Sequence, residues 1–126
     1  MMDVNGDPLT RKIIAAAITV SKNLGNGLLE SVYHACLAHE LSKAGFDVVK
    51  QPTMPLIYEG IQFESAFRPD LIVNQSVIVE VKATTSTLPV HRAQLLTYMR
   101  LSGIQTGLLI NFHSFPFKNG ISRVSL

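Results

Sequence analysis

The sequence predicts an α/β domain in which helices pack on a single β-sheet. The chain has 126 residues, the usual size of one domain, and 47% of them are hydrophobic, which is enough for a packed core. Apolar residues recur at the helical period near the N-terminus and then at the strand period. The expected element order is α-α-β-β-β-β-β-α-β-β, and one domain should span residues 1–126.

The first two elements are predicted to be amphipathic helices. Residues 10–24 carry Ile13, Ala17 and other apolar residues at the helical period, and glycines at 25 and 27 end the pattern. A second helix is expected over residues 28–44, with Asn26 as a candidate N-cap. Its apolar stripe consists of Leu29, Val32, Tyr33, Cys36, Leu37 and Leu41.

Strand patterns follow, interrupted by one more helix. Glu59-Gly60 is a typical hairpin turn, and Asn74-Gln75-Ser76 is a second turn between two apolar runs. The helix, residues 89–101, has Pro89 in its first turn and Gly103 after its end. Strands are expected at residues 46–50, 56–58, 61–67, 70–73, 77–82, 107–112 and 121–126.

Two carboxylates interrupt the apolar strands at residues 70–73 and 77–82. On the second strand the valines face one side, and Glu80 and Lys82 face the other. If Val73 faces Val77 across the three-residue turn, Asp70 lies directly opposite Glu80 on the same face of the sheet. A slip of one residue would instead place Asp70 opposite another position, so this register is an expectation.

Opposed like charges destabilise a sheet unless something neutralises them. A divalent cation would resolve the conflict, because carboxylate oxygens are the ligands that Mg²⁺ and Mn²⁺ prefer. Lys82, on the same face, would partly offset the negative charge and point at whatever the metal holds. The alternative is that Glu80 and Lys82 form only an exposed ion pair on a surface strand.

Three motifs in the chain resemble those of known nucleases. Pro69-Asp70, followed after nine residues by Glu80-Val81-Lys82, resembles the motif of the PD-(D/E)XK nuclease superfamily. Gly27-x-x-Glu30-x-x-Tyr33 resembles the signature of the GxxExxY protein family, a small branch of that superfamily. Gln94-x-x-x-Tyr98 is similar to a motif of RecB-like nucleases, and the run at residues 108–112 is similar to the closing strand.

The resemblance implies a restriction-endonuclease-like core, with a central mixed sheet between helices, and metal-dependent hydrolysis of phosphodiester bonds. It implies that Asp70, Glu80 and the Val81 backbone carbonyl hold Mg²⁺ or Mn²⁺. It also implies that Lys82 lies near the attacking water and that Glu30 approaches the metal from a helix. The implied catalytic residues are therefore Glu30, Asp70, Glu80 and Lys82.

The third helix offers candidate substrate contacts. Gln94 and Tyr98 are four residues apart and share a helix face, His91 precedes Gln94 by three, and Arg92 lies beside that face. They are candidates for contacts to phosphate and bases, or else a polar side facing solvent. Structural roles also remain open for two residues. For Glu30 the alternative is that it only stabilises the start of its helix through the helix dipole, and for Tyr33 that it is only an aromatic residue of the core.

Charge and composition bear on partner and location. Residues 1–80 hold all nine acidic residues, whereas residues 81–126 hold five Lys or Arg and no acid. This asymmetry suggests an anionic partner unless folding interleaves the two halves. The chain has one cysteine, no apolar run of membrane-spanning length, and no signal-peptide features at residues 1–3, so a cytoplasmic protein without a membrane span is expected.

The sequence therefore predicts a Mg²⁺- or Mn²⁺-dependent nuclease acting on nucleic acid, with DNA as the first expectation. Two alternatives stay open: a nucleic-acid-binding protein that keeps the fold without turnover, and an interaction protein whose sheet residues are only structural. A homodimer is also considered, because a second copy would enlarge the binding surface of so small a domain.

Overall fold

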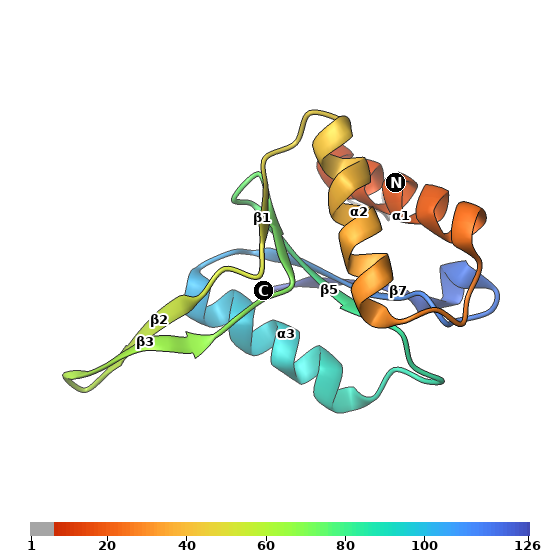
Figure 1. Cartoon of the computed structure of the whole chain (residues 1–126). Coiled ribbons are helices and arrows are strands. Elements are labelled where there is room, and N and C mark those ends of the chain that lie inside the picture. Colours follow the sequence, from red (N-terminus) through yellow and green to blue (C-terminus); the bar gives the residue numbers. More distant parts are fainter. Residues whose placement is uncertain (1–6) are drawn as a thin grey trace.

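The structure, a computed structural model, describes residues 7–126, and its helices and strands follow the predicted order (Figure 1). The prediction about a signal peptide concerns residues outside this range. None of the helices in residues 7–126 combines the length and apolar character needed to cross a bilayer. The elements are α1 (Pro8–Leu24), α2 (Glu30–Lys43), β1 (Val48–Lys50), β2 (Met54–Tyr58), β3 (Ile61–Phe67), β4 (Leu71–Val73), β5 (Val77–Lys82), α3 (Pro89–Ser102), β6 (Thr106–Asn111), the short 3-10 helix η1 (Phe117–Gly120) and β7 (Ile121–Ser125).

A mixed five-stranded sheet lies at the centre of the fold, in the order β1-β4-β5-β6-β7. The β5–β6 pair is parallel and the other pairs are antiparallel. Helices α1 and α2 cover one face of this sheet and α3 covers the other (Figure 1). The predicted α/β fold with a central mixed sheet between helices is confirmed.

Successive side chains of β5 point to opposite faces of the sheet, and the two faces pack in different hydrophobic clusters. Val77, Val79 and Val81 belong to the hydrophobic cluster shared with α1 and α2. Ile78 belongs to the smaller cluster shared with α3. Glu80 therefore lies on the α3-facing side of the strand, two residues beyond Ile78.

The expectation of a single sheet is wrong. Strands β2 and β3 pair only with each other and form a separate hairpin that projects from the body (Figure 1). The turn residues Glu59 and Gly60 both have positive φ, 46° and 86°, which is the backbone of a tight two-residue hairpin. The turn at Glu59 and Gly60 could be predicted from local sequence. Whether the hairpin joins the main sheet depends on contacts between strands far apart in the chain, which local sequence does not reveal.

Helix α2 begins two residues later than predicted, at Glu30 instead of residue 28. Asn26 is not its N-cap, because Leu29 occupies that position and no side chain caps the helix. Leu29, expected in the apolar stripe, lies outside the helix and is 74% exposed. Gly27 has φ +104°, a backbone conformation that a residue with a side chain adopts only under strain.

The Tyr33 side chain holds the loop between α1 and α2. Its hydroxyl donates to the Gly25 carbonyl at 2.7 Å and accepts from the Leu28 amide at 3.1 Å. A ring nitrogen of His113 lies 2.8 Å from the Leu28 carbonyl, and the buried Tyr33 ring stacks on Phe112 with centroids 4.7 Å apart. Tyr33 is thus a core aromatic, and its hydroxyl fixes the loop that precedes Glu30.

Replacing Tyr33 by Phe should lower the free energy of unfolding by about 1–2 kcal/mol. The stack on Phe112 would remain, but the Leu28 amide and the Gly25 carbonyl would each lose a hydrogen bond in a partly buried loop. Urea unfolding of the two proteins measures the difference. Tyr58→Phe is the matched control, because the Tyr58 side chain is 61% exposed and should cost almost nothing; equal effects of the two changes would contradict the loop's role.

Candidate functional site

Asp70 and Glu80 face each other where β4 begins and β5 approaches its end. The paired residues of the two strands are Leu71 with Val79, Ile72 with Ile78, and Val73 with Val77, which is the predicted register. The Asp70 backbone amide donates to Glu80 Oε2 at 2.8 Å, and the Val81 amide donates to Asp70 Oδ2 at 2.7 Å. Each carboxylate therefore accepts a backbone hydrogen bond from the strand that carries the other.

The environment of Glu80 strongly perturbs its carboxylate. It is only 3% exposed, and its pKa is raised from 4.5 to about 7, first by burial and then by the negative charge of Asp70. The hydrogen bond from the Asp70 amide and the charge of Lys82 act in the opposite direction. A buried carboxylate with this pKa is poised to exchange its proton for a cation near neutral pH.

Lys82 follows Glu80 by two residues on the same face of β5 and is half-buried. Its charge acts on Glu80, which places the ammonium within electrostatic reach of the carboxylate pair. The strand position is fixed on the other side, where the Phe112 amide donates to the Lys82 carbonyl at 2.8 Å. The alternation of side chains along β5 therefore keeps Lys82 on the face that carries Glu80.

Val81 contributes backbone groups to this edge. Its amide points toward Asp70, and the carbonyl of a strand residue lies on the same side as its amide. Within residues 7–126, β4 pairs with β5 only up to Val79, so no β4 residue takes the Val81 carbonyl in the ladder. A third oxygen donor is thus directed to the side on which the two carboxylates meet.

Helix α2 lies on the face of the sheet opposite α3, and its first turn approaches the carboxylates. Glu30 is its first residue, is exposed, and makes a small contribution to the raised pKa of Glu80 through its negative charge. One turn later, His34 Nε2 lies 2.9 Å from the Asp70 carbonyl. This hydrogen bond joins α2 to the residue that carries the first carboxylate.

The role of His34 was missed from the sequence, where no partner for it could be recognised. A usable signal was its spacing: it lies four residues after Glu30 and therefore on the same face of the helix. Phe67 was also missed. Its ring stacks on Tyr98 with centroids 5.1 Å apart, which joins the base of the hairpin to α3.

Helix α3 brings Tyr98 toward the carboxylates. Burial raises the pKa of the Tyr98 hydroxyl, and the charges of Glu80 and Asp70 raise it further, so the ring lies within their field. Gln94, one turn earlier on the same face, is exposed. Tyr98 is therefore the α3 side chain that interacts electrostatically with the acidic pair, and Gln94 is related to it by helical spacing.

His91 and Arg92 do not share the position of Gln94 on α3. A ring nitrogen of His91, Nδ1, accepts a hydrogen bond from the Leu88 amide at 3.1 Å, so this side chain caps the start of α3. Arg92 is exposed and lies two residues before Gln94, which is about 200° around the helix. Arg92 therefore projects from a different side of α3 than Gln94 and Tyr98.

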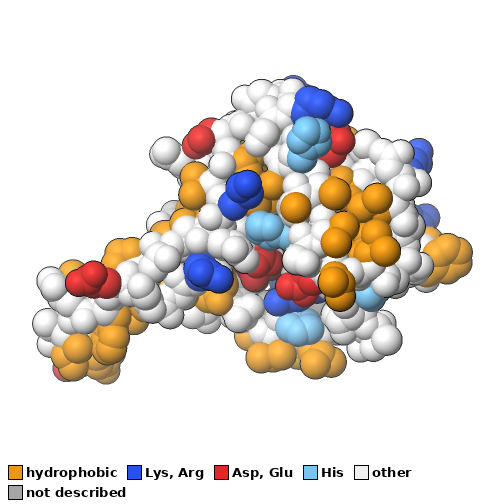
Figure 2. Space-filling model, in the orientation of Figure 1, with side chains coloured by type: hydrophobic (Ala, Val, Ile, Leu, Met, Phe, Trp, Pro, Cys, Tyr) orange, Lys and Arg blue, Asp and Glu red, His pale blue; other side chains and the backbone are white. Residues whose placement is uncertain are grey.

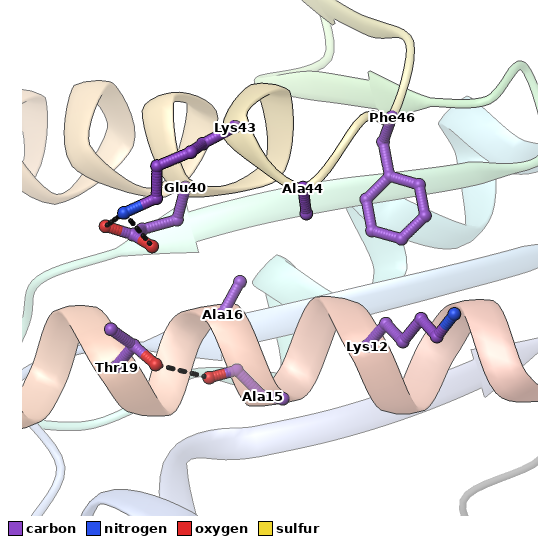
Figure 3. Close-up of a pocket in the computed structure, with 8 residues that line it drawn as sticks. All are labelled: Lys12, Ala15, Ala16, Thr19, Glu40, Lys43, Ala44 and Phe46. Carbon is purple, nitrogen blue, oxygen red and sulfur yellow. Dashed lines mark hydrogen bonds and ion pairs between the residues drawn. The ribbon is translucent and has the colours of Figure 1, made fainter.

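A separate groove lies between α1 and the end of α2 (Figure 3). It has a volume of about 430 Å³, and half of its lining is apolar, namely three alanines and Phe46. Its charged groups at one end, Lys43 and Glu40, form an ion pair at 3.3 Å. Neither Asp70 nor Glu80 lines this groove, so it is not part of the acidic pair's surroundings.

The donor set at the acidic pair fits a hard divalent cation. Asp70 Oδ1 and Glu80 Oε1 accept no hydrogen bond within residues 7–126, so each carboxylate keeps one free oxygen. No cluster of three or more His, Cys, Asp or Glu side chains in this range is arranged around one metal position. Mg²⁺ is commonly held by one or two carboxylates with water completing its shell, so two carboxylates and a carbonyl suffice.

Comparison with known proteins gave one family. The sequence pattern of the PD-(D/E)XK nuclease superfamily matches residues 7–124. Neither the curated proteins nor the solved structures gave a match. The match covers nearly the whole chain, and the fold and the acidic pair agree with it; the chain therefore belongs to the PD-(D/E)XK nuclease superfamily.

Proposed function

We propose that this protein is a metal-dependent nuclease that hydrolyses phosphodiester bonds of nucleic acid, with DNA as the first candidate substrate. The observation that carries the proposal is the pairing of Asp70 with Glu80 through two backbone hydrogen bonds, with Lys82 on the same face. Membership in the nuclease superfamily supports the same chemistry. The Gly27, Glu30 and Tyr33 spacing further supports placement in the GxxExxY branch.

The residues proposed to hold Mg²⁺ or Mn²⁺ are Asp70, Glu80 and the Val81 carbonyl. When bound, the cation would polarise a phosphoryl oxygen and lower the pKa of a coordinated water. Asp70 and Glu80 supply the negative charge that binds it, and their cross-strand hydrogen bonds hold them in position beforehand. This preorganisation matters because a loosely held ligand would lose affinity and catalytic geometry together.

Lys82 and Glu30 have complementary proposed roles. Lys82 orients the attacking water or stabilises the negative charge that develops on the phosphate. Glu30, at the start of α2, faces the same centre and accepts protons or hydrogen bonds from water around it. The His34 hydrogen bond to the Asp70 carbonyl supports this role, because it keeps the helix start beside the carboxylates.

Gln94 and Tyr98 are proposed to contact the nucleic acid. The support is that Gln94 and Tyr98 share a helix face, that the Tyr98 hydroxyl is influenced by the charges of Glu80 and Asp70, and that the Tyr98 ring stacks on Phe67. An aromatic ring next to a polar amide suits contacts to a base and to the phosphate backbone. His91, which caps the helix, would act mainly through the position of α3, and Arg92 would attract phosphate from a neighbouring side.

Asp70→Asn should abolish cleavage and also abolish the thermal stabilisation that Mg²⁺ gives the parent. Asn can still accept from the Val81 amide, so the fold should remain while one metal-binding charge is lost. Cleavage of single- and double-stranded DNA and RNA in Mg²⁺, Mn²⁺ or EDTA, together with melting curves, measures both effects.

Two further variants show whether the effects of Asp70→Asn are specific to metal binding. Lys82→Ala should reduce turnover while Mg²⁺ still stabilises the protein, because the two carboxylates remain. Asp47→Asn changes an exposed carboxylate away from the acidic pair and should alter neither quantity. A parent that Mg²⁺ does not stabilise and that cleaves none of the substrates would refute the nuclease proposal.

The free energy of unfolding in EDTA should fall as the pH rises from about 4.5 to about 7. Folded Glu80 keeps its proton up to about pH 7, whereas the unfolded chain loses it near 4.5, so the folded state binds the extra proton in between. The loss from this group is at most about 3 kcal/mol. Urea unfolding at a series of pH values measures it.

Glu80→Gln isolates this contribution, because all other groups stay the same and the amide oxygen can still accept from the Asp70 amide. The variant should match the parent near pH 5 and be more stable than the parent at pH 8 in EDTA. Parallel pH profiles for the two proteins would mean that Glu80 is ionised throughout and is not perturbed by burial.

Gln94→Ala and Tyr98→Phe should weaken nucleic-acid binding several-fold with little change in stability. Tyr98→Phe preserves the ring stack on Phe67 and removes only the hydroxyl, which makes it a cleaner test than truncation to alanine. Binding to labelled oligonucleotides in Ca²⁺ or EDTA, where cleavage is suppressed, gives the affinity. Ala93→Ser, at an exposed position about 100° around the helix from Gln94, is the control; if all three variants bind like the parent, the α3 contact is wrong.

A further inference from the structure

The β2–β3 hairpin is an uncovered two-stranded sheet. Its strands make no ladder with the main sheet, and the hairpin extends away from the body with hydrophobic side chains visible along it (Figures 1 and 2). An isolated two-stranded hairpin is marginally stable in water and normally needs something packed on one face. Only its base is covered, where Phe67 stacks on Tyr98 of α3.

The pairing of the two strands gives the hairpin one apolar face. Leu56 pairs with Phe63 and Tyr58 pairs with Ile61, and directly paired residues of an antiparallel ladder share a face. Because positions two apart also share a face, all four side chains lie together. Tyr58 is 61% exposed, Ile61 56% and Phe63 48%, so this face is open to solvent.

The opposite face has a different character. There Ile57 pairs with Gln62, and Glu64 lies two residues further along the same strand. Ile57 is 65% exposed and is an isolated apolar residue among polar neighbours. The hairpin is therefore amphipathic, and only the face with Leu56, Tyr58, Ile61 and Phe63 has the continuity of a docking surface. We call it the apolar hairpin face.

Charge excludes nucleic acid as the occupant of this face. Residues 51–67 contain two acidic residues, Glu59 at the tip and Glu64 on the opposite face, and no Lys or Arg. A phosphate backbone would meet negative charge and no cation along the hairpin. The apolar hairpin face itself contains no ionisable group except the Tyr58 hydroxyl, so its partner must also be apolar and uncharged at the contact.

A second copy of the hairpin meets these requirements. A two-fold axis would bring the same face of each copy together, apolar on apolar, while both Glu64 side chains stay on the outside. At about 200 Å² for each large side chain, the exposed parts of Tyr58, Ile61 and Phe63 amount to about 330 Å² per copy. The pair would bury about 700 Å² or somewhat more, which is below the roughly 1,200 Å² of stable specific interfaces and therefore fits a weak, transient contact.

We propose that this chain forms a two-fold dimer in which the apolar hairpin faces of two copies pack against each other. The small buried area predicts a weak dimer, with a dissociation constant of roughly hundreds of micromolar. The dimer would cover the exposed hairpin and would fix the two acidic sites relative to each other, since Asp70 follows β3 by three residues. The proposal is independent of the nuclease chemistry and could fail or succeed without it.

Tryptophan reporters test which face is buried, because the chain contains no tryptophan. In the full chain, Tyr58→Trp places the fluorophore on the apolar hairpin face, and Ile57→Trp places it one residue away on the opposite face. When the protein concentration is raised from about 0.1 µM to about 1 mM, the emission of the Tyr58→Trp variant should shift to shorter wavelength. The emission of the Ile57→Trp variant should stay unchanged, and sedimentation over the same range should show a monomer–dimer equilibrium.

Ile61→Lys provides the disruptive counterpart, and its circular dichroism and melting temperature check that it folds. Its dissociation constant should rise at least about tenfold, whereas the matched change Ile57→Lys should leave it unaltered. If the parent stays monomeric up to about 1 mM, the proposal is wrong. This holds even if another protein is later found to bind the apolar hairpin face. A dimer that survives Ile61→Lys, or that shifts the emission of both tryptophan variants equally, overturns it as well.

Discussion

The whole charged centre of this protein depends on the reciprocal hydrogen bonds between the β4 and β5 strands at Asp70 and Glu80. Two carboxylates so close in a buried place would repel, and the structure offsets part of this cost with one backbone amide for each. The arrangement is possible because β4 ends its ladder at Leu71, which leaves the amides of Asp70 and Val81 without strand partners. The end of a short strand is thus what makes room for the carboxylates.

Strand β5 contributes side chains both to the hydrophobic core and to the acidic pair. Its valines pack against α1 and α2, and the alternate residues change from Ile78, packed under α3, to Glu80 and then Lys82 at the strand's end. The deep packing of the first half holds the second half in place. Burial also raises the pKa of Glu80, so the same packing that positions this carboxylate increases its affinity for a proton.

Helix α2 is joined to this centre by local contacts that also determine where it starts. Tyr33 and His113 hold the loop before the helix, and His34 binds the Asp70 carbonyl. Two of the residues in the Gly27, Glu30 and Tyr33 motif therefore have structural explanations. Glu30, in the first turn of α2, has a favourable interaction with the helix dipole, and its negative charge also makes a small contribution at Glu80.

The sequence by itself determined the order of elements, most of their limits, and the register that sets Asp70 against Glu80. These depend on local properties: the hydrophobic period, and a three-residue turn that allows one in-phase pairing of Val73 with Val77. The three nuclease-like motifs were likewise visible, because each is a short spacing within one or two elements. The family assignment over residues 7–124 agrees with them.

The tertiary structure decided what local patterns do not encode. It separated the β2–β3 hairpin from the main sheet, started α2 at Glu30, and brought His34 and Phe67 to the edge of the acidic centre. It also placed Arg92 on a different side of α3 from Gln94. Each of these outcomes depends on packing between segments far apart in the chain, where many residues compete for the same partners and no single spacing in the sequence fixes the result.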